Sequence, residues 1–400
     1  MTYDLAAVRA SFPALAEGAA HFDGPGGSQV PRDVADAVAA TMVSALANRG
    51  QVTRAERRAD AIVVEARQAI ADLVGAPDPR GVVFGRSMTA LTFDLARTLA
   101  RTWGPGDEVV VTRLDHDANI RPWVIAAASA GATVRWADFD PQTGELPTEA
   151  VTGLLTRRTK VVAVTAASNL LGTCPDVASV AAAAHEVGAL VHVDGVHLTP
   201  HAPVDVVAMG ADVYACSPYK FLGPHLGASV ASPDLLERLH PDKLLPSTDA
   251  VPERFELGTL PYELLAGTTA AVDFLASIGG SVGDRRTRLL TALERLEQHE
   301  AALAARLEAG LGDLPGVRLL GHAARRTPTV AFTVAGRRPR DVARELADTG
   351  VNAPASHFYA LEASRFLGLG DEGAVRAGIA PYTSDDDVDR LVAGVAAAVH

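Results

Sequence analysis

Cysteine is nearly absent from this 400-residue chain, which contains only Cys174 and Cys216. A secreted disulfide scaffold needs more cysteines than this, so the count favours a protein of a reducing compartment. No run of eighteen or more apolar residues occurs, and the first residues do not form a basic segment followed by an apolar stretch. We therefore expect neither a membrane span nor a signal peptide, and we predict a cytoplasmic protein.

Aromatic residues make up only 5% of the chain, so alanine, valine and leucine must supply most of the core. Positive charge is also in deficit, because 36 Lys and Arg residues face 48 Asp and Glu residues and leave a formal net charge of −12. General nucleic-acid binding requires a basic face, so we exclude nucleic acid as a partner. An anionic cofactor is not excluded, because a single local pocket can bind it.

Short apolar runs that alternate with helical patterns fill the first two thirds of the sequence. This alternation predicts an α/β fold with a mostly parallel, seven-stranded sheet between helices. Ligands of such sheets bind at the carboxyl ends of the strands. The expected strands lie within residues 81–84, 108–112, 132–139, 160–168, 190–195, 212–217 and 227–232.

The pattern changes beyond the last of these runs. A long charged helix is expected near 283–308, followed by a strand within 327–336, a further helix and a final strand–turn–helix. This part predicts a smaller α+β domain at the C-terminal end, and we expect the first residues to join it. The predicted boundaries are 15–280 for the large domain and 1–14 with 281–400 for the small domain.

Two chemically active residues follow neighbouring runs. Asp194 ends the buried run LVHVD, and Lys220 lies in the Pro/Gly-rich loop that follows the next run. Both should lie at one edge of the sheet, where a buried carboxylate is costly unless it is paired. A carboxylate that can pair with a protonated ring nitrogen, and a lysine that can form an imine, are the minimum equipment for pyridoxal 5′-phosphate (PLP) chemistry. A plain ion pair or a solvated lysine is the alternative.

Further polar residues follow other expected strands. Ser87 and Thr89 lie at the start of a helix in FGRSMTALTFDL, where backbone N–H groups can bind a phosphate. His116 could stack on a flat ring or move protons, and Asn169 could donate to a ring oxygen. Each has a simpler interpretation, such as an N-cap for Ser87. Their joint placement after successive strands favours one common site.

A metal site is the competing interpretation of one cluster. His192, Asp194, His197 and His201 lie close in sequence, and the first two share one face of a strand. A metal would leave Lys220 and the possible phosphate loop unexplained, so we predict no metal.

The order of these motifs resembles fold-type I PLP enzymes, specifically the class V aminotransferase family and its cysteine-desulfurase-like branch. The resemblance covers nearly the whole chain, from HFDGPGGSQVP at 21–31 to VRAGIAPYTSDDDVDRL at 375–391. It implies a homodimer that binds PLP between its domains and acts on a small amino acid.

The resemblance also implies a role for each matching residue. Lys220 holds PLP as a Schiff base, Asp194 pairs with the pyridine nitrogen, and His116 stacks on the ring. Arg376 clamps the substrate carboxylate, as a bidentate guanidinium can. The other implied positions are Ser87, Met88, Asn169, His197, Ser217 and Tyr219 for the cofactor, Thr259 from the partner subunit, and Gly26 and Gly27 in the substrate-pocket loop.

The sequence departs from the family at three points. His197 stands where the family usually has Gln, and Tyr219 stands where it has His. Desulfurases also carry a nucleophilic cysteine on a mobile loop, whereas the matching stretch 350–364 has none. That stretch offers Ser356, His357 and Tyr359 instead, and we expect His357 and Tyr359 to line the substrate site. A persulfide formed by the usual route is therefore not expected.

The expected reaction is cleavage of the C–S bond of cysteine or an S-substituted cysteine, by β-elimination or in the manner of a desulfurase. An amino-acid epimerase or an aminotransferase of a specialised pathway is the first alternative, because all these reactions begin identically. A non-catalytic PLP-binding protein is the second. Arg54, Arg57, Arg58 and Arg121 either contact a larger acidic substrate or are solvated.

Overall fold

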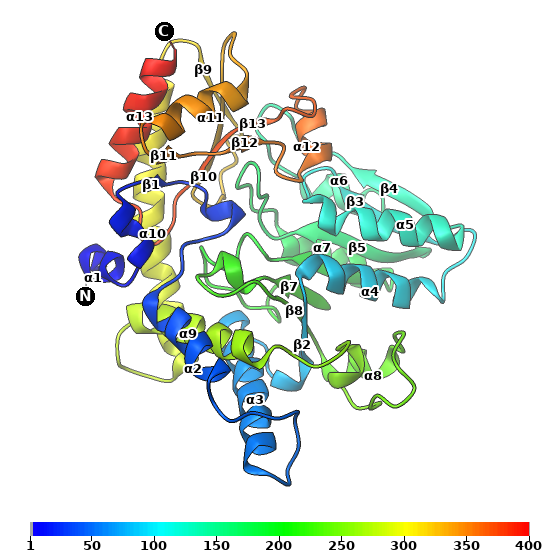
Figure 1. The fold of residues 1–400 in the computed structure, drawn as a ribbon. Helices are drawn as coiled ribbons and strands as arrows, with labels where there is room; N and C mark the ends of the chain where they lie inside the picture. The colour runs from blue at the N-terminus through cyan, green and yellow to red at the C-terminus, as the bar shows by residue number, and fades with distance from the viewer. Residues whose placement is uncertain (1–2, 400) are drawn as a thin grey trace.

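The computed structural model describes residues 3–399, and its main element is a seven-stranded sheet of order β2-β8-β7-β6-β5-β3-β4 (Figure 1). Only β8 runs antiparallel to its neighbours. The predicted α/β class with a mostly parallel, seven-stranded sheet is confirmed. The strands are β2 Val82–Gly85, β3 Glu108–Thr112, β4 Thr133–Ala137, β5 Thr159–Thr165, β6 Leu190–Asp194, β7 Val213–Cys216 and β8 Gly227–Ala231.

Helices cover both faces of this sheet, and the alternation of valines along β3 explains why. Val109 and Val111 pack in one core cluster with Leu99 and Trp123, whereas Val110 belongs to the larger cluster on the other face. Successive strand residues point to opposite faces, so a run of apolar residues needs cover on both sides. The helices are α1 Leu5–Ala10, α2 Arg32–Met42, α3 Arg54–Val74, α4 Met88–Ala100, α5 Arg121–Ala130, α6 Thr148–Thr152, α7 Val177–Glu186, α8 Pro233–Arg238, α9 Tyr262–Ile278, α10 Arg285–Gly312, α11 Pro339–Asp348, α12 Leu361–Phe366 and α13 Asp385–Ala398.

A second, four-stranded sheet of order β12-β13-β10-β9 lies in the C-terminal part, beside α10, α11 and α13 (Figure 1). It is antiparallel throughout. Its apolar side chains form a core cluster of their own, which matches the α+β pattern expected there. The strands are β9 Val317–Leu320, β10 Thr329–Val334, β12 Ala355–Ser356 and β13 Ala374–Gly378.

The N-terminal segment contacts the C-terminal part, although its exact boundary stays a prediction. Arg9 forms an ion pair with Asp387 at 2.7 Å. The short strand β1 (Ala20–His21) pairs in parallel with β11 (Val351–Asn352). Because this pairing lies beyond residue 14, we propose that the first domain boundary falls after His21.

The sheet register brings the ends of three strands level. Thr165 of β5 pairs with Asp194 of β6, which in turn pairs with Ala215 of β7. The loops that follow these strands therefore open on one edge of the sheet. No helix within residues 3–399 is long and apolar enough to cross a membrane.

Candidate active site

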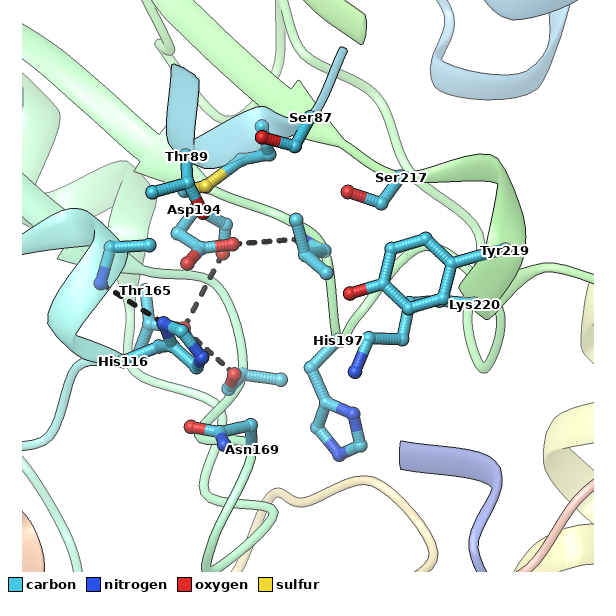
Figure 2. Close-up of a pocket in the computed structure, with 14 residues that line it drawn as sticks. Ser87, Thr89, His116, Thr165, Asn169, Asp194, His197, Ser217, Tyr219 and Lys220 are labelled. Atoms are coloured by element: carbon cyan, nitrogen blue, oxygen red, sulfur yellow. Dashed lines mark hydrogen bonds between the residues drawn. The ribbon is translucent and has the colours of Figure 1, made fainter. Parts of the chain in front are cut away.

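A cavity lies at this edge of the sheet (Figure 2). In the view of Figure 2, Ser87 and Ser217 lie at one end and Asn169 and His197 at the other. Every predicted cofactor-binding residue except Thr259 lines it. The lining residues are Ser87, Met88, Thr89, His116, Ala118, Thr165, Ala167, Asn169, Asp194, Val196, His197, Ser217, Tyr219 and Lys220.

Asp194 ends β6 and is buried at the cavity wall. Its Oδ1 accepts a hydrogen bond from the backbone N–H of Val196 at 3.0 Å. Burial raises the pKa of Asp194 to about 6, against the opposing effects of this hydrogen bond and of Lys220. Since it forms no ion pair with residues 3–399, a cationic group in the cavity would stabilise its charged form.

Lys220 enters the cavity from the short 3-10 turn Pro218–Lys220, which follows β7. Its Nζ donates to the backbone carbonyl of Pro25. Burial and, to a smaller extent, the positive charge of Arg376 together lower the pKa of Lys220 to about 7, against the opposing effect of Asp194. A substantial fraction of this amine is therefore neutral and nucleophilic near pH 7.

His116 follows β3 and presents its imidazole to the same cavity. Its Nδ1 accepts a hydrogen bond from the backbone N–H of Ala118 at 3.0 Å, which leaves the proton of the neutral ring on Nε2. The ring stacks on Tyr359 with 5.5 Å between centroids. Burial lowers the pKa of His116 to about 3, so a neutral aromatic face borders the cavity.

The start of α4 closes one end of the cavity. Ser87 is the N-cap, because its Oγ accepts from the N–H of Ala90 at 3.1 Å, and Met88 begins the helix. The N–H groups of a first helical turn have no partner within the helix, so this end can bind an anion. Ser87 is thus both a cap and a wall of the cavity.

Gly227 of β8 allows this helix start to lie against the sheet. A Cβ at this position would lie 2.2 Å from the carbonyl carbon of Ser87 and 2.3 Å from the Met88 nitrogen. We expect Gly227→Ala to push this turn out of place and to lower the free energy of unfolding by about 3 kcal/mol. Urea denaturation measures this loss. Gly104→Ala is the control, because a Cβ there meets nothing within 4 Å; equal stability of the two variants would contradict the prediction.

The side chains considered above as metal ligands contact different partners. His192 Nδ1 lies 2.8 Å from Asn119 Oδ1, and His201 Nδ1 lies 2.9 Å from Glu300 Oε2. His197 Nε2 lies within 3.0 Å of the hydroxyls of two threonines, Thr327 and Thr329. Among the described residues, no group of three or more His, Cys, Asp or Glu is placed to hold a metal ion.

A second chamber adjoins the cavity and shares six lining residues with it, among them His116, Asn169, Tyr219 and Lys220. It extends between the two sheets, because residues of β12 and β13 form part of its wall. Its remaining lining residues are Pro25, Gly26, Thr89, Phe93, Asp117, Ala118, Arg121, Ser356, Phe358, Tyr359 and Arg376.

Arg376 of β13 is buried in the wall of this chamber. One terminal nitrogen donates to the backbone carbonyl of Asn169 at 2.7 Å, and the guanidinium lies 3.8 Å from the ring centroid of Phe358. Its Nε is buried without a hydrogen-bond partner among residues 3–399. One edge of a rigid donor fork is therefore available for a planar anion.

Three predicted residues lie outside these two spaces. Gly27 packs against the ring of Tyr219, since a Cβ at Gly27 would lie 3.4 Å from that ring. His357 lines a separate pocket beside Arg338, whereas its neighbour Tyr359 lines the chamber. Thr259 lies in the loop before α9, outside the cavity of its own chain.

Several residues of the site were not predicted from the sequence. Thr327 and Thr329 bind His197 from β10 and the segment before it, more than a hundred residues away in the chain. Phe358 covers Arg376, and its carbonyl accepts from Asn169 Nδ2 at 2.8 Å. Pro25, which accepts from Lys220, is the one of these residues that the sequence indicated, because it lies in the GPGG segment of the predicted substrate loop.

Comparison with known proteins agrees with this geometry. The model of the family "aminotransferase class-V" matches residues 20–391. The uncharacterized protein MT3887 of Mycobacterium tuberculosis is 37% identical over 99% of each chain. A probable cysteine desulfurase of Mycolicibacterium paratuberculosis is 32% identical over 98% of this chain, which spans 58% of that longer protein.

Among solved structures, the cysteine desulfurase CsdA of Escherichia coli has a TM-score of 0.87 and 29% identity, covering 100% of this chain and 99% of that one. This likeness confirms the predicted fold type I. The chain therefore belongs to the class V aminotransferase family of PLP-dependent enzymes.

Proposed function

We propose that this protein binds PLP on Lys220 and cleaves the C–S bond of cysteine or of an S-substituted cysteine. The observation that carries the proposal is the meeting of Lys220 and Asp194 in one cavity that opens into a chamber walled by Arg376. Relatives and solved structures named cysteine desulfurase support the choice of reaction.

The residues of the cavity fit PLP at each of its polar groups. Asp194 is a carboxylate for the pyridine nitrogen, Lys220 is an amine for the aldehyde carbon, and the start of α4 is an anion site for the phosphate. Oδ1 of Asn169 is buried without a partner among residues 3–399, so a hydroxyl on the ring that donates to it would satisfy it.

When bound, PLP supplies an electron sink that eases removal of the substrate α-proton and departure of a group from Cβ. Asp194 would hold a proton at the ring nitrogen, and His116 would line the space for the ring. Arg376 orients the α-carboxylate through its free edge. The neutral Nζ of Lys220 would accept the α-proton, and Tyr359, which lines the chamber, would protonate the leaving sulfur.

The lowered pKa of Lys220 gives a pH prediction for cofactor loading. Only the neutral amine reacts with an aldehyde, so its reactive fraction rises about tenfold per pH unit below the pKa and levels off above it. We expect the rate at which PLP attaches to the apoprotein to rise up to about pH 7 and then stay constant. Stopped-flow absorbance follows this rate. A rate that keeps rising to pH 10 would indicate a lysine with an ordinary pKa.

We further propose a cytoplasmic homodimer in which Thr259 reaches the phosphate site of the partner subunit. In support, Thr259 lies in a loop that also exposes Leu257, while Leu244 and Leu245 are exposed nearby in the chain. Sedimentation tests the dimer, and a monomeric protein that still binds PLP fully would exclude the shared site.

The missing loop cysteine favours direct elimination over sulfur transfer. Elimination and hydrolysis convert cysteine and water into pyruvate, ammonia and hydrogen sulfide, which needs no oxidant or sulfur acceptor. Burial raises the pKa of Cys174 to about 11 and that of Cys216 to about 12, so neither thiol is activated as a nucleophile.

The test is to incubate the PLP-loaded protein with L-cysteine and with S-methyl-L-cysteine. We expect pyruvate together with sulfide or methanethiol, at rates unchanged by Cys174→Ser. D-cysteine as the product would indicate an epimerase, and a requirement for a keto acid would indicate an aminotransferase. Absence of any product from either compound would contradict the proposal.

A further inference from the structure

Arg121 is a second cation in the wall of the substrate chamber. It begins α5 and lines the same space as Lys220 and Arg376. Its side chain is partly exposed, with 36% of its surface accessible, so it is open to the chamber contents. Arg121 and Arg376 are thus the two arginines in the described wall of this chamber, and only Arg376 has a role in the proposed reaction.

Two carboxylates fix the orientation of Arg121. One terminal nitrogen, NH2, donates to Asp117 at 2.9 Å and to Glu362 at 3.2 Å, while Nε lies 3.4 Å from Asp117. The other terminal nitrogen, NH1, has no hydrogen-bond partner among residues 3–399. A guanidinium that is held on one side in this way keeps its remaining donors pre-oriented for an anion.

Anchoring of the loop does not account for Arg121. Glu362 lies in the first turn of α12, in the stretch that lacks the loop cysteine, and it is also bound by Arg113 at 3.3 Å. Arg113 in turn pairs with Asp138 at 2.7 Å and does not line the chamber. Two arginines therefore share the contact that anchors Glu362. Of these two, only Arg121 lines the chamber.

We propose that NH1 of Arg121 binds a second anionic group of the substrate, at the far end of its side chain. With the α-carboxylate on Arg376, this selects S-substituted cysteines whose substituent ends in a carboxylate. The preference rests on the proposed function for the bound PLP and for the position of the α-carboxylate, but not on cleavage of the C–S bond. Asp117 and Glu362 partly offset the charge of Arg121, so the preference is moderate.

The experiment compares two ligands of equal size, S-(2-carboxyethyl)-L-cysteine and its neutral amide, S-(2-carbamoylethyl)-L-cysteine. The rapid absorbance change of the PLP-loaded protein on mixing gives the dissociation constant of each. We expect the acid to bind about tenfold more tightly than the amide, as for a partly exposed charge-assisted contact. Arg121→Met should remove this preference, and Arg113→Met should keep it.

Two results would overturn the proposal. One is equal binding of acid and amide by the unaltered protein. The other is a loss of affinity for both ligands alike in Arg121→Met and in Arg113→Met, which would reduce Arg121 to a loop anchor. Failure of the proposed C–S cleavage looks different, because the preference for the acid would persist while no pyruvate or sulfur product appeared from either ligand. Failure of PLP binding itself would leave no absorbance change with either ligand.

Discussion

Replacing Lys220 by alanine is expected to abolish covalent attachment of PLP and to lower turnover at least about 1,000-fold. Lys220 is the amine that lines the cavity, and in the proposed reaction its Nζ also accepts the α-proton. Removal of a residue that serves as both nucleophile and base costs several orders of magnitude in rate. Release of pyruvate from L-cysteine measures the loss, and reduction with borohydride followed by peptide mapping measures the attachment.

The composition of the chain makes this mapping unambiguous. It contains only three lysines, Lys160, Lys220 and Lys243. Lys160 pairs with Asp107 and Lys243 with Asp249, and neither lines the cavity. Lys160→Ala and Lys243→Ala serve as controls that should keep the cofactor and the rate. Attachment of PLP to either of these residues in the unaltered protein would refute the assigned role of Lys220.

Arg376→Lys is expected to lower kcat/KM for L-cysteine about 100-fold, mainly through KM. A lysine ammonium cannot reproduce the planar fork, and it cannot donate to the Asn169 carbonyl and to a carboxylate in the same geometry. The cofactor should stay in place, because Arg376 lines only the adjoining chamber. Steady-state kinetics measure the change, and the near-visible spectrum is the control for cofactor content.

The contrary result for Arg376→Lys would be a normal KM with a reduced kcat. That pattern would mean that the arginine acts on the transition state or on the fold rather than on the substrate carboxylate. Since burial already lowers the pKa of Arg376 to about 9, the native charge is costly at this position, which fits a residue kept for binding an anion.

The central part of the site could be predicted because it follows from strand order. Asp194 and Lys220 follow consecutive strands whose ends lie at one edge of a parallel sheet, so their sequence positions alone bring them together. The same reasoning placed Ser87, His116 and Asn169. All five line the cavity.

The wall contributed by residues 350–364 was predicted only in part. The sequence provided no reason to prefer His357 or Tyr359 as a lining residue of the substrate site, yet of these two only Tyr359 lines the chamber. Phe358 and Tyr359 adopt φ values of +51° and +58°, a region that favours glycine, so their residue types gave no sign of this turn. The two-residue strand β1 likewise carries too short a pattern to reveal its pairing with β11.

The most direct test of the central claim is the near-visible absorption spectrum of the purified protein after loading with PLP, recorded before and after addition of L-cysteine. We predict a band of the lysine-bound cofactor that changes at once on mixing, together with the release of sulfide and pyruvate. Two results would contradict the assignment of Lys220, Asp194 and Arg376 to this chemistry. One is a protein that stays colourless after PLP is supplied. The other is an absorption band that does not change on addition of L-cysteine while no sulfide appears.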